Sequence, residues 1–319
     1  MIPAALRKSG QYVAMAAIWA ALALFFGLMS HNFLSARAFL ALANRIPTLM
    51  VISTGMTLVL IVGGIDLSVG SIAGLCGALA GVVIVDDHAG FLTAVLLCLA
   101  LGASVGAVNG IISVCLGIPS FIVTLGMLEI ARGLSYLLTH SQTKYIGAAV
   151  EGLSDPMGFL GVSPAFLIAI LVVAAGQIAL SRTVFGRYLV AIGANEPAAR
   201  LSGIDPRVPK IAVFALAGML AGLGGVFLTS RLGSSDPNAG IGLELSAIAA
   251  AVIGGTSLTG GKGSVVKTLF GVLVVATLEA GLAQIGASDP MKRVATGLAI
   301  ILAVALDAWR QRWARRGWV

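Results

Sequence analysis

Nine residues at positions 63–71, Gly-Gly-Ile-Asp-Leu-Ser-Val-Gly-Ser, separate two long apolar runs. They place one carboxylate, Asp66, and two hydroxyls, Ser68 and Ser71, between segments that are apolar enough to span a membrane. An ionisable group at membrane depth is costly and therefore suggests a functional site. The glycines in this stretch let the backbone unwind, which lipid permits only where the backbone is buried in protein or lines a cavity. We therefore predict a broken helix, with Asp66, Ser68 and Ser71 at the break or along a substrate path.

The composition excludes a soluble protein with one core. Of 319 residues, 58% are hydrophobic and only 10% are charged, whereas about a quarter are charged in soluble domains. A single all-α, polytopic transmembrane domain over residues 1–319 is the simplest interpretation. Several glycines repeat at four-residue spacing, which predicts close helix packing in lipid. The three histidines and three cysteines lack metal-ligand spacing, so we expect no metal and no cofactor.

Apolar windows predict about ten transmembrane helices, with both termini in the cytoplasm. In that orientation most of the 20 Lys and Arg residues fall in cytoplasmic segments, as the positive-inside rule requires. The net charge of +7 then reflects topology and gives no reason to expect nucleic acid as a partner. The eighth span is short for a membrane of about 30 Å and is either a full span or a half-helix. The predicted spans are 13–29, 46–63, 71–85, 91–115, 119–138, 164–180, 211–230, 244–255, 265–282 and 293–308.

Residues 181–210 form the largest predicted cytoplasmic connection, called here the coupling segment. Asn195 can cap a short helix that begins at Glu196, and Gly203 can close it. Two short helices outside the bilayer would suit docking of a cytoplasmic partner. The alternative is an amphipathic segment that binds only lipid headgroups. The residues themselves leave these two interpretations open.

A second glycine-rich run, residues 254–264, does not fit a nucleotide-binding loop. A phosphate loop needs a glycine five residues before its Gly-Lys pair and a Ser or Thr after it. Here Thr256 occupies the first of these positions and Gly263 follows Lys262. We therefore predict a tight polar reversal between two spans.

Together, these three segments resemble the permease subunit of ribose-type, monosaccharide ABC importers, the inner-membrane component of binding-protein-dependent transport. The matching residues follow one another in order over about 200 residues. They are Gly-Ile-Asp-Leu-Ser-Val-Gly-Ser at 64–71, Gly-Arg-Tyr at 186–188, Gly-Ala-Asn-Glu at 193–196, Ala-Ala-Arg-Leu-Ser-Gly-Ile at 198–204, Glu-Leu at 244–245, Ala-Ile-Ala-Ala at 247–250, Gly-Gly-Thr-Ser-Leu at 254–258 and Gly-Gly-Lys-Gly at 260–263.

The resemblance implies a multi-pass permease of the bacterial inner membrane that imports a monosaccharide or related polyol and is not itself an enzyme. It implies a second copy of the chain, surrounding lipid, an ATP-binding cassette subunit or fused tandem ATPase, and a periplasmic sugar-binding protein as partners. It also implies which residues meet the ATPase: Gly186, Arg187, Asn195, Glu196, Arg200 and Gly203.

Two other functions would also use carboxylates within the membrane. An ion-gradient-driven secondary transporter could use membrane carboxylates such as Asp66, Glu244 and Glu279, but no inverted repeat is evident. An intramembrane aspartyl protease needs a second aspartate that shares the site, and none is suitably placed. Glu129 and Arg132, three residues apart on one helix face, are expected to form a structural ion pair.

Overall fold

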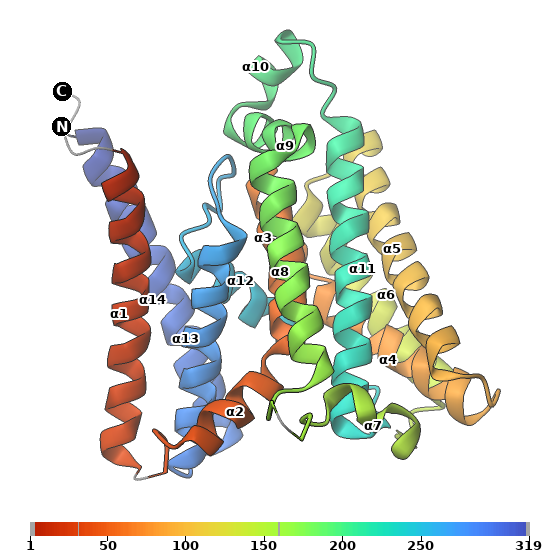
Figure 1. Cartoon of the computed structure of the whole chain (residues 1–319). Coiled ribbons are helices and arrows are strands. Elements are labelled where there is room, and N and C mark those ends of the chain that lie inside the picture. The colour runs from red at the N-terminus through yellow and green to blue at the C-terminus, as the bar shows by residue number, and fades with distance from the viewer. Residues whose placement is uncertain (1–3, 31, 159, 317–319) are drawn as a thin grey trace.

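The computed structural model describes residues 4–30, 32–158 and 160–316, and this part of the chain is almost entirely helical (Figure 1). Two short strands, β1 (Lys144–Tyr145) and β2 (Ser234–Ser235), pair antiparallel. The helices are α1 (Ala4–Met29), α2 (Ala36–Arg45), α3 (Pro47–Ile61), α4 (Val69–Val85), α5 (Phe91–Leu116), α6 (Ser120–Thr139), α7 (Ala148–Ser154), α8 (Pro164–Arg182), α9 (Val184–Ala194), α10 (Glu196–Leu201), α11 (Arg207–Leu232), α12 (Leu243–Ile253), α13 (Val265–Gln284) and α14 (Asp289–Arg316).

Six described helices are long and apolar enough to cross a membrane, and a seventh span results if α2 and α3 count as one bent helix. The six are the Tyr12–Met29 part of α1 and helices α5, α6, α8, α11 and α13. Each of the ten predicted segments does contain a helix, but α3, α4 and α12 have only 15, 17 and 11 residues. At a rise of 1.5 Å per residue, α12 is only about 17 Å long. The predicted all-α membrane protein is therefore confirmed in outline, while the number of spans stays a prediction.

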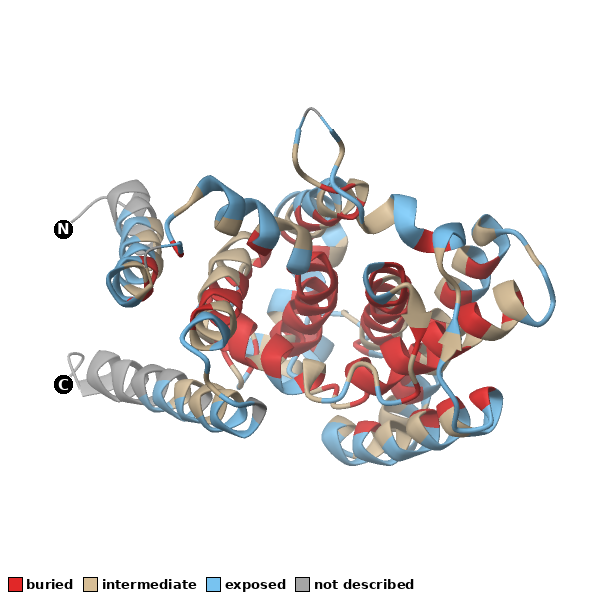
Figure 2. Ribbon diagram, turned by 90° about the horizontal axis from the view of Figure 1, so that it is seen from below, coloured by how far each residue is buried: buried red, intermediate tan, exposed pale blue. Residues whose placement is uncertain are grey.

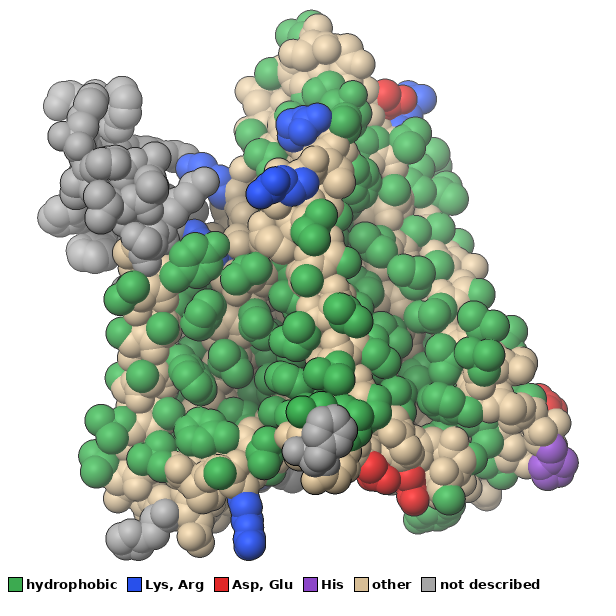
Figure 3. Space-filling model, in the orientation of Figure 1, with side chains coloured by type: hydrophobic (Ala, Val, Ile, Leu, Met, Phe, Trp, Pro, Cys, Tyr) green, Lys and Arg blue, Asp and Glu red, His purple; other side chains and the backbone are tan. Residues whose placement is uncertain are grey.

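The interior of the bundle is built from α3, α4, α11 and α12. Every residue of α3 is buried, as expected for a helix that is hydrophobic on all sides. Buried residues concentrate in these central helices, while α1 and α14 lie at one side with exposed faces (Figure 2). In the view of Figure 3, hydrophobic side chains cover the middle of the molecule and most of the charged ones lie towards its two ends. This distribution suits a protein that is surrounded by lipid.

Glycines bring the backbones of α5 and α11 into direct contact. A Cβ atom added at Gly218 would overlap the carbonyl oxygen of Gly102, and one added at Gly106 would overlap that of Phe214. Such close approach increases van der Waals contact between helices in a medium that offers no hydrophobic driving force. The glycine packing predicted from the four-residue spacing is thus present at this crossing.

We predict that Gly218→Ala destabilises the protein by about 1–3 kcal/mol, because its methyl group forces the two backbones apart. Thermal unfolding of the detergent-purified protein would measure the loss. Gly126→Ala is the matched control, since Gly126 lies in another apolar helix and its added Cβ would meet no atom within 4 Å. Equal stability of the two variants would contradict the backbone-contact interpretation.

Candidate functional site

The predicted helix break is present at residues 62–68, between α3 and α4. Hydroxyl groups of α6 hold its backbone. The amide of Ile65 donates to Ser120 Oγ at 2.9 Å, and that of Leu67 donates to Thr124 Oγ1 at 3.0 Å. Thr124 Oγ1 also donates to the carbonyl of Ile65 at 3.2 Å. Since lipid offers no hydrogen bonds, these side chains replace the helical partners that the break removes.

Asp66 closes the turn that leads into α4. Its Oδ1 atom accepts hydrogen bonds from the amide of Ser68 at 2.9 Å and from the Ser68 hydroxyl at 2.6 Å. Asn109 of α5 donates in turn to Ser68 Oγ at 3.0 Å. Asp66 and Ser68 are fully buried, and neither lines either of the two cavities described below. This local geometry favours a structural cap at the break over a substrate contact for Asp66.

Ser71, in the first turn of α4, is buried and accepts a hydrogen bond from Arg132 of α6 at 3.1 Å. The predicted ion pair between Glu129 and Arg132 is wrong. Glu129 is exposed, and no ion pair joins the two residues in the described part of the chain. The reason is that Arg132 turns inward to the neighbouring helix while Glu129 stays on the outer face of α6.

Helices α9 and α10 of the coupling segment project beyond the membrane-spanning helices at one end of the molecule (Figure 1). Asn195 Oδ1 accepts the amide of Ala198 at 3.0 Å, so the predicted N-terminal cap is confirmed. Gly203 has φ +84, and its amide donates to the carbonyl of Arg200 at 3.0 Å. The amide of the following residue, Ile204, donates to the carbonyl of Ala199. This left-handed closure of α10 is the ending predicted for Gly203.

Glu196 joins α10 to the start of α11. Its carboxylate pairs with Arg200 at 2.8 Å and with Lys210 at 2.5 Å. Partial burial raises the pKa of Glu196, but the hydrogen bonds from Lys210 and then Arg200 outweigh this effect. The net pKa lies below its ordinary value, so Glu196 is an anion at neutral pH. The other two predicted coupling residues lie on α9, where Gly186 is buried near its start and Arg187 is exposed.

A cavity of about 320 Å³ connects the coupling segment to the helix break. Its lining includes the charged residues Glu196, Arg200 and Lys210 and the two glycines at the start of the break, Gly63 and Gly64. The remaining lining residues are Val62, Ser113, Val114, Gly117, Ile118, Pro119, Ser120, Pro206 and Phe214. Two predicted coupling residues, Glu196 and Arg200, therefore share this space with the first glycines of the break, whereas Asp66, Ser68 and Ser71 do not line it.

The broken-helix segment at residues 63–71, the coupling segment and the glycine-rich run at residues 254–264 also meet at a second place, where their backbones are in contact. We call Gly63, Gly193, Gly260 and Gly261 the glycine junction. The amide of Gly261 donates to the carbonyl of Ile61, at the end of α3, at 2.9 Å. A Cβ atom at Gly193 would overlap that same carbonyl, and one at Gly260 would lie 3.1 Å from Gly63 Cα. The end of α9, the helix break and the polar reversal at residues 254–264 are thus in direct contact.

Sequence reasoning missed several of these participants. Ser120 and Thr124 carried a usable signal, because hydroxyls four residues apart lie on one face of a helix. Asn109 was the only amide side chain in the apolar run 91–115. The glycine junction carried no such signal, since its members belong to three distant segments.

Comparison with known proteins identifies the family. A family model described as "Branched-chain amino acid transport system / permease component" matches residues 38–304. The ribose import permease protein RbsC of Escherichia coli K12 is 39% identical over 290 residues, which cover 89% of each chain. RbsC of Bacillus subtilis is 38% identical, over 88% of this chain and 87% of that protein. The E. coli K12 D-allose transport system permease protein AlsC is 33% identical, over 94% and 91%.

No solved structure matches the chain significantly. The family model and the relatives, each compared over most of its own length and most of this chain, indicate the same family. The chain therefore belongs to this family of transport-system permease components, and the predicted resemblance to ribose-type ABC permeases is confirmed.

We predict that Asp66→Asn keeps most folded protein and most uptake, because the amide oxygen can still accept both hydrogen bonds from Ser68. Asp66→Ala leaves the amide and the hydroxyl of Ser68 without an acceptor, which costs about 1–3 kcal/mol for each buried donor. This variant should therefore lose both folded protein and uptake. Membrane-inserted yield, thermal unfolding and solute uptake would be measured together. If Asn is as inactive as Ala while both variants insert normally, the charge is required and a role in the substrate path is favoured.

Proposed function

We propose that this member of the family is the permease subunit of an ATP-driven sugar importer in the bacterial inner membrane. The observation that carries this proposal is the extent of the similarity, which spans most of this chain and most of relatives named for the transport or import of ribose, allose, arabinose and fructose. The solute is accordingly a monosaccharide or a related polyol. The chain is a transport subunit, and ATP hydrolysis belongs to a separate partner.

The coupling segment is the proposed contact with an ATP-binding cassette subunit or a fused tandem ATPase. Three features support this assignment: α10 is rigidly closed at both ends by Asn195 and Gly203, it projects from the bundle, and Arg187 is exposed on the adjacent α9. No hydrogen bond or ion pair holds the Arg187 side chain among the described residues. It is therefore free to meet an acidic group of the partner.

The proposed topology has ten spans and cytoplasmic termini. Helix α1 begins, and α14 ends, at the same end of the molecule as α9 and α10 (Figure 1). If the coupling segment faces the cytoplasm, both termini do as well. The opposite end then faces a periplasmic sugar-binding protein, and two copies of the chain form the complete translocation unit within the lipid bilayer.

Reconstitution in proteoliposomes tests this function against the ion-gradient alternative. The purified permease alone should neither hydrolyse ATP nor take up labelled D-ribose, whether or not a proton or sodium gradient is imposed. Uptake should require the ATPase partner, the binding protein and ATP, with the ATP supplied on the side of the vesicle membrane that corresponds to the cytoplasm. Uptake by the permease alone on an ion gradient would overturn the proposal in favour of a secondary transporter.

The docking role of α10 gives a further prediction. Glu196→Lys should reduce ATP-driven uptake at least about tenfold, because it removes the carboxylate that α10 would present to the partner and places a third cation beside Arg200 and Lys210. Inserted amount and elution profile should stay normal, since α10 lies outside the bundle. Normal uptake would instead support the lipid-headgroup interpretation.

A charge-swapped double variant serves as the control for this prediction. Glu196→Lys combined with Lys210→Glu restores an internal ion pair between the same two positions. If the ATPase partner contacts the carboxylate at position 196 of α10, uptake stays low in the double variant. Full recovery of uptake would show that only the internal pair matters, and would contradict docking through Glu196.

A further inference from the structure

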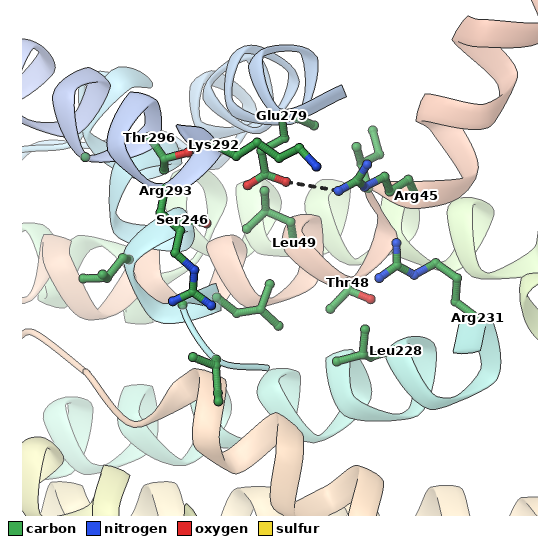
Figure 4. A pocket seen from close by; sticks show the side chains of 17 residues that line it. Arg45, Thr48, Leu49, Leu228, Arg231, Ser246, Glu279, Lys292, Arg293 and Thr296 are labelled. Carbon is green, nitrogen blue, oxygen red and sulfur yellow. Dashed lines mark hydrogen bonds and ion pairs between the residues drawn. The ribbon is translucent and has the colours of Figure 1, made fainter. Parts of the chain in front are cut away.

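A second cavity, of about 430 Å³, lies at the end of the bundle opposite the coupling segment. It opens among the C-terminal parts of α2, α11 and α13 and the N-terminal parts of α3, α12 and α14 (Figure 4). Apolar side chains such as Leu49, Leu228 and Leu243 form part of its wall. Its size is that of a pocket for a small molecule, which typically measures about 300–1,000 Å³.

The charged groups of this cavity are strongly unbalanced. Four cations line it, and Glu279 is the one carboxylate among the lining residues. Among the described lining residues, the cations thus outnumber the carboxylate. The cations are Arg45, Arg231, Lys292 and Arg293.

The one carboxylate among these residues makes an ion pair of long distance, with Arg45. Glu279 Oε2 lies 3.5 Å from Arg45 Nη2, a long contact whose side chains are 29% and 46% exposed, and such exposed pairs contribute little. Figure 4 shows Arg231 pointing towards Arg45 and Arg293 reaching the other side of the cavity, near Ser246. Neither Arg231 nor Arg293 takes part in an ion pair in the described chain.

We propose that this cavity binds an anionic oxygen group, a carboxylate or a phosphate, through Arg231 and Arg293. A guanidinium presents a planar fork of donors that matches both groups. Walls of low dielectric constant and an excess of one sign of charge strengthen the attraction of an anion. The anionic group would contact one arginine, and a hydroxylated remainder would reach the other arginine across the cavity, along the leucine-lined wall.

Two sources present this chemistry at this end of the bundle: an acidic sugar and the headgroup of an anionic phospholipid. The site goes beyond the proposed function, because the sugars in the names of the relatives carry no charge. Binding to the full-length permease without its partners does not depend on ATP-driven import. Failure of the site and failure of the proposed function are therefore distinguishable.

The first arm of the test uses D-gluconate and, as its uncharged counterpart, D-glucitol. Isothermal titration of the full-length permease in phosphatidylcholine nanodiscs should detect gluconate and not glucitol. Arg231→Gln and Arg293→Gln should each weaken binding by roughly tenfold or more. Arg37→Gln is the matched control, since Arg37 is an exposed arginine of α2 that does not line the cavity, and it should leave binding unchanged.

The second arm uses nanodiscs that contain phosphatidylglycerol, with native mass spectrometry to count the lipids retained by the protein. Retention that is lost in Arg231→Gln and Arg293→Gln but kept in Arg37→Gln identifies the lipid headgroup as the source. The two substitutions lie on different helices, so misfolding of one variant would not by itself explain a shared loss of binding. Thermal unfolding measures whether each variant is folded. If neither gluconate nor phosphatidylglycerol distinguishes the unaltered protein from these variants, the proposal is overturned.

Discussion

The need to satisfy backbone polar groups without water organises the centre of this protein. Between α3 and α4 the chain leaves the helix for residues 62–68, in the middle of a bundle of apolar helices. Lipid would make the exposed amides and carbonyls prohibitively costly. Ser120 and Thr124 of α6, together with Asp66, supply the missing hydrogen bonds. The position of α6 against α4 is therefore a condition for the break, and the buried polar side chains have a structural explanation before any role in transport is invoked.

The same break ties the membrane interior to the surface that we assign to the ATPase partner. First, Gly63 and Gly64 of the break and the Glu196–Lys210 ion pair line the same cavity. Second, at the glycine junction, the end of α9 and the polar reversal at residues 254–264 press against the end of α3. A displacement of α9 therefore acts on the break through direct backbone contact.

Features that depend on local sequence were predictable, and features that depend on distant segments were not. The cap at Asn195, the closure at Gly203 and the break itself follow from a few consecutive residues, and the structure has all three. The Glu129–Arg132 pair failed because helix spacing says which residues are neighbours, while packing decides which way each side chain turns. Arg132 instead donates a hydrogen bond to Ser71 on another helix, α4. The lining of the cationic cavity likewise comes from six helices, and no sequence periodicity indicates that these helices meet.

The backbone contact at Gly193 has a mechanical consequence. A side chain between two elements acts as a soft spring, because it can change rotamer and absorb a movement of several tenths of an ångström. At this contact no side chain intervenes, and the hydrogen bond from Gly261 to Ile61 fixes the third segment against the same carbonyl. Packed backbones resist compression and shift between discrete arrangements. The junction therefore behaves as a stiff pivot, at which even a small rotation of α9 must be accompanied by movement of the end of α3.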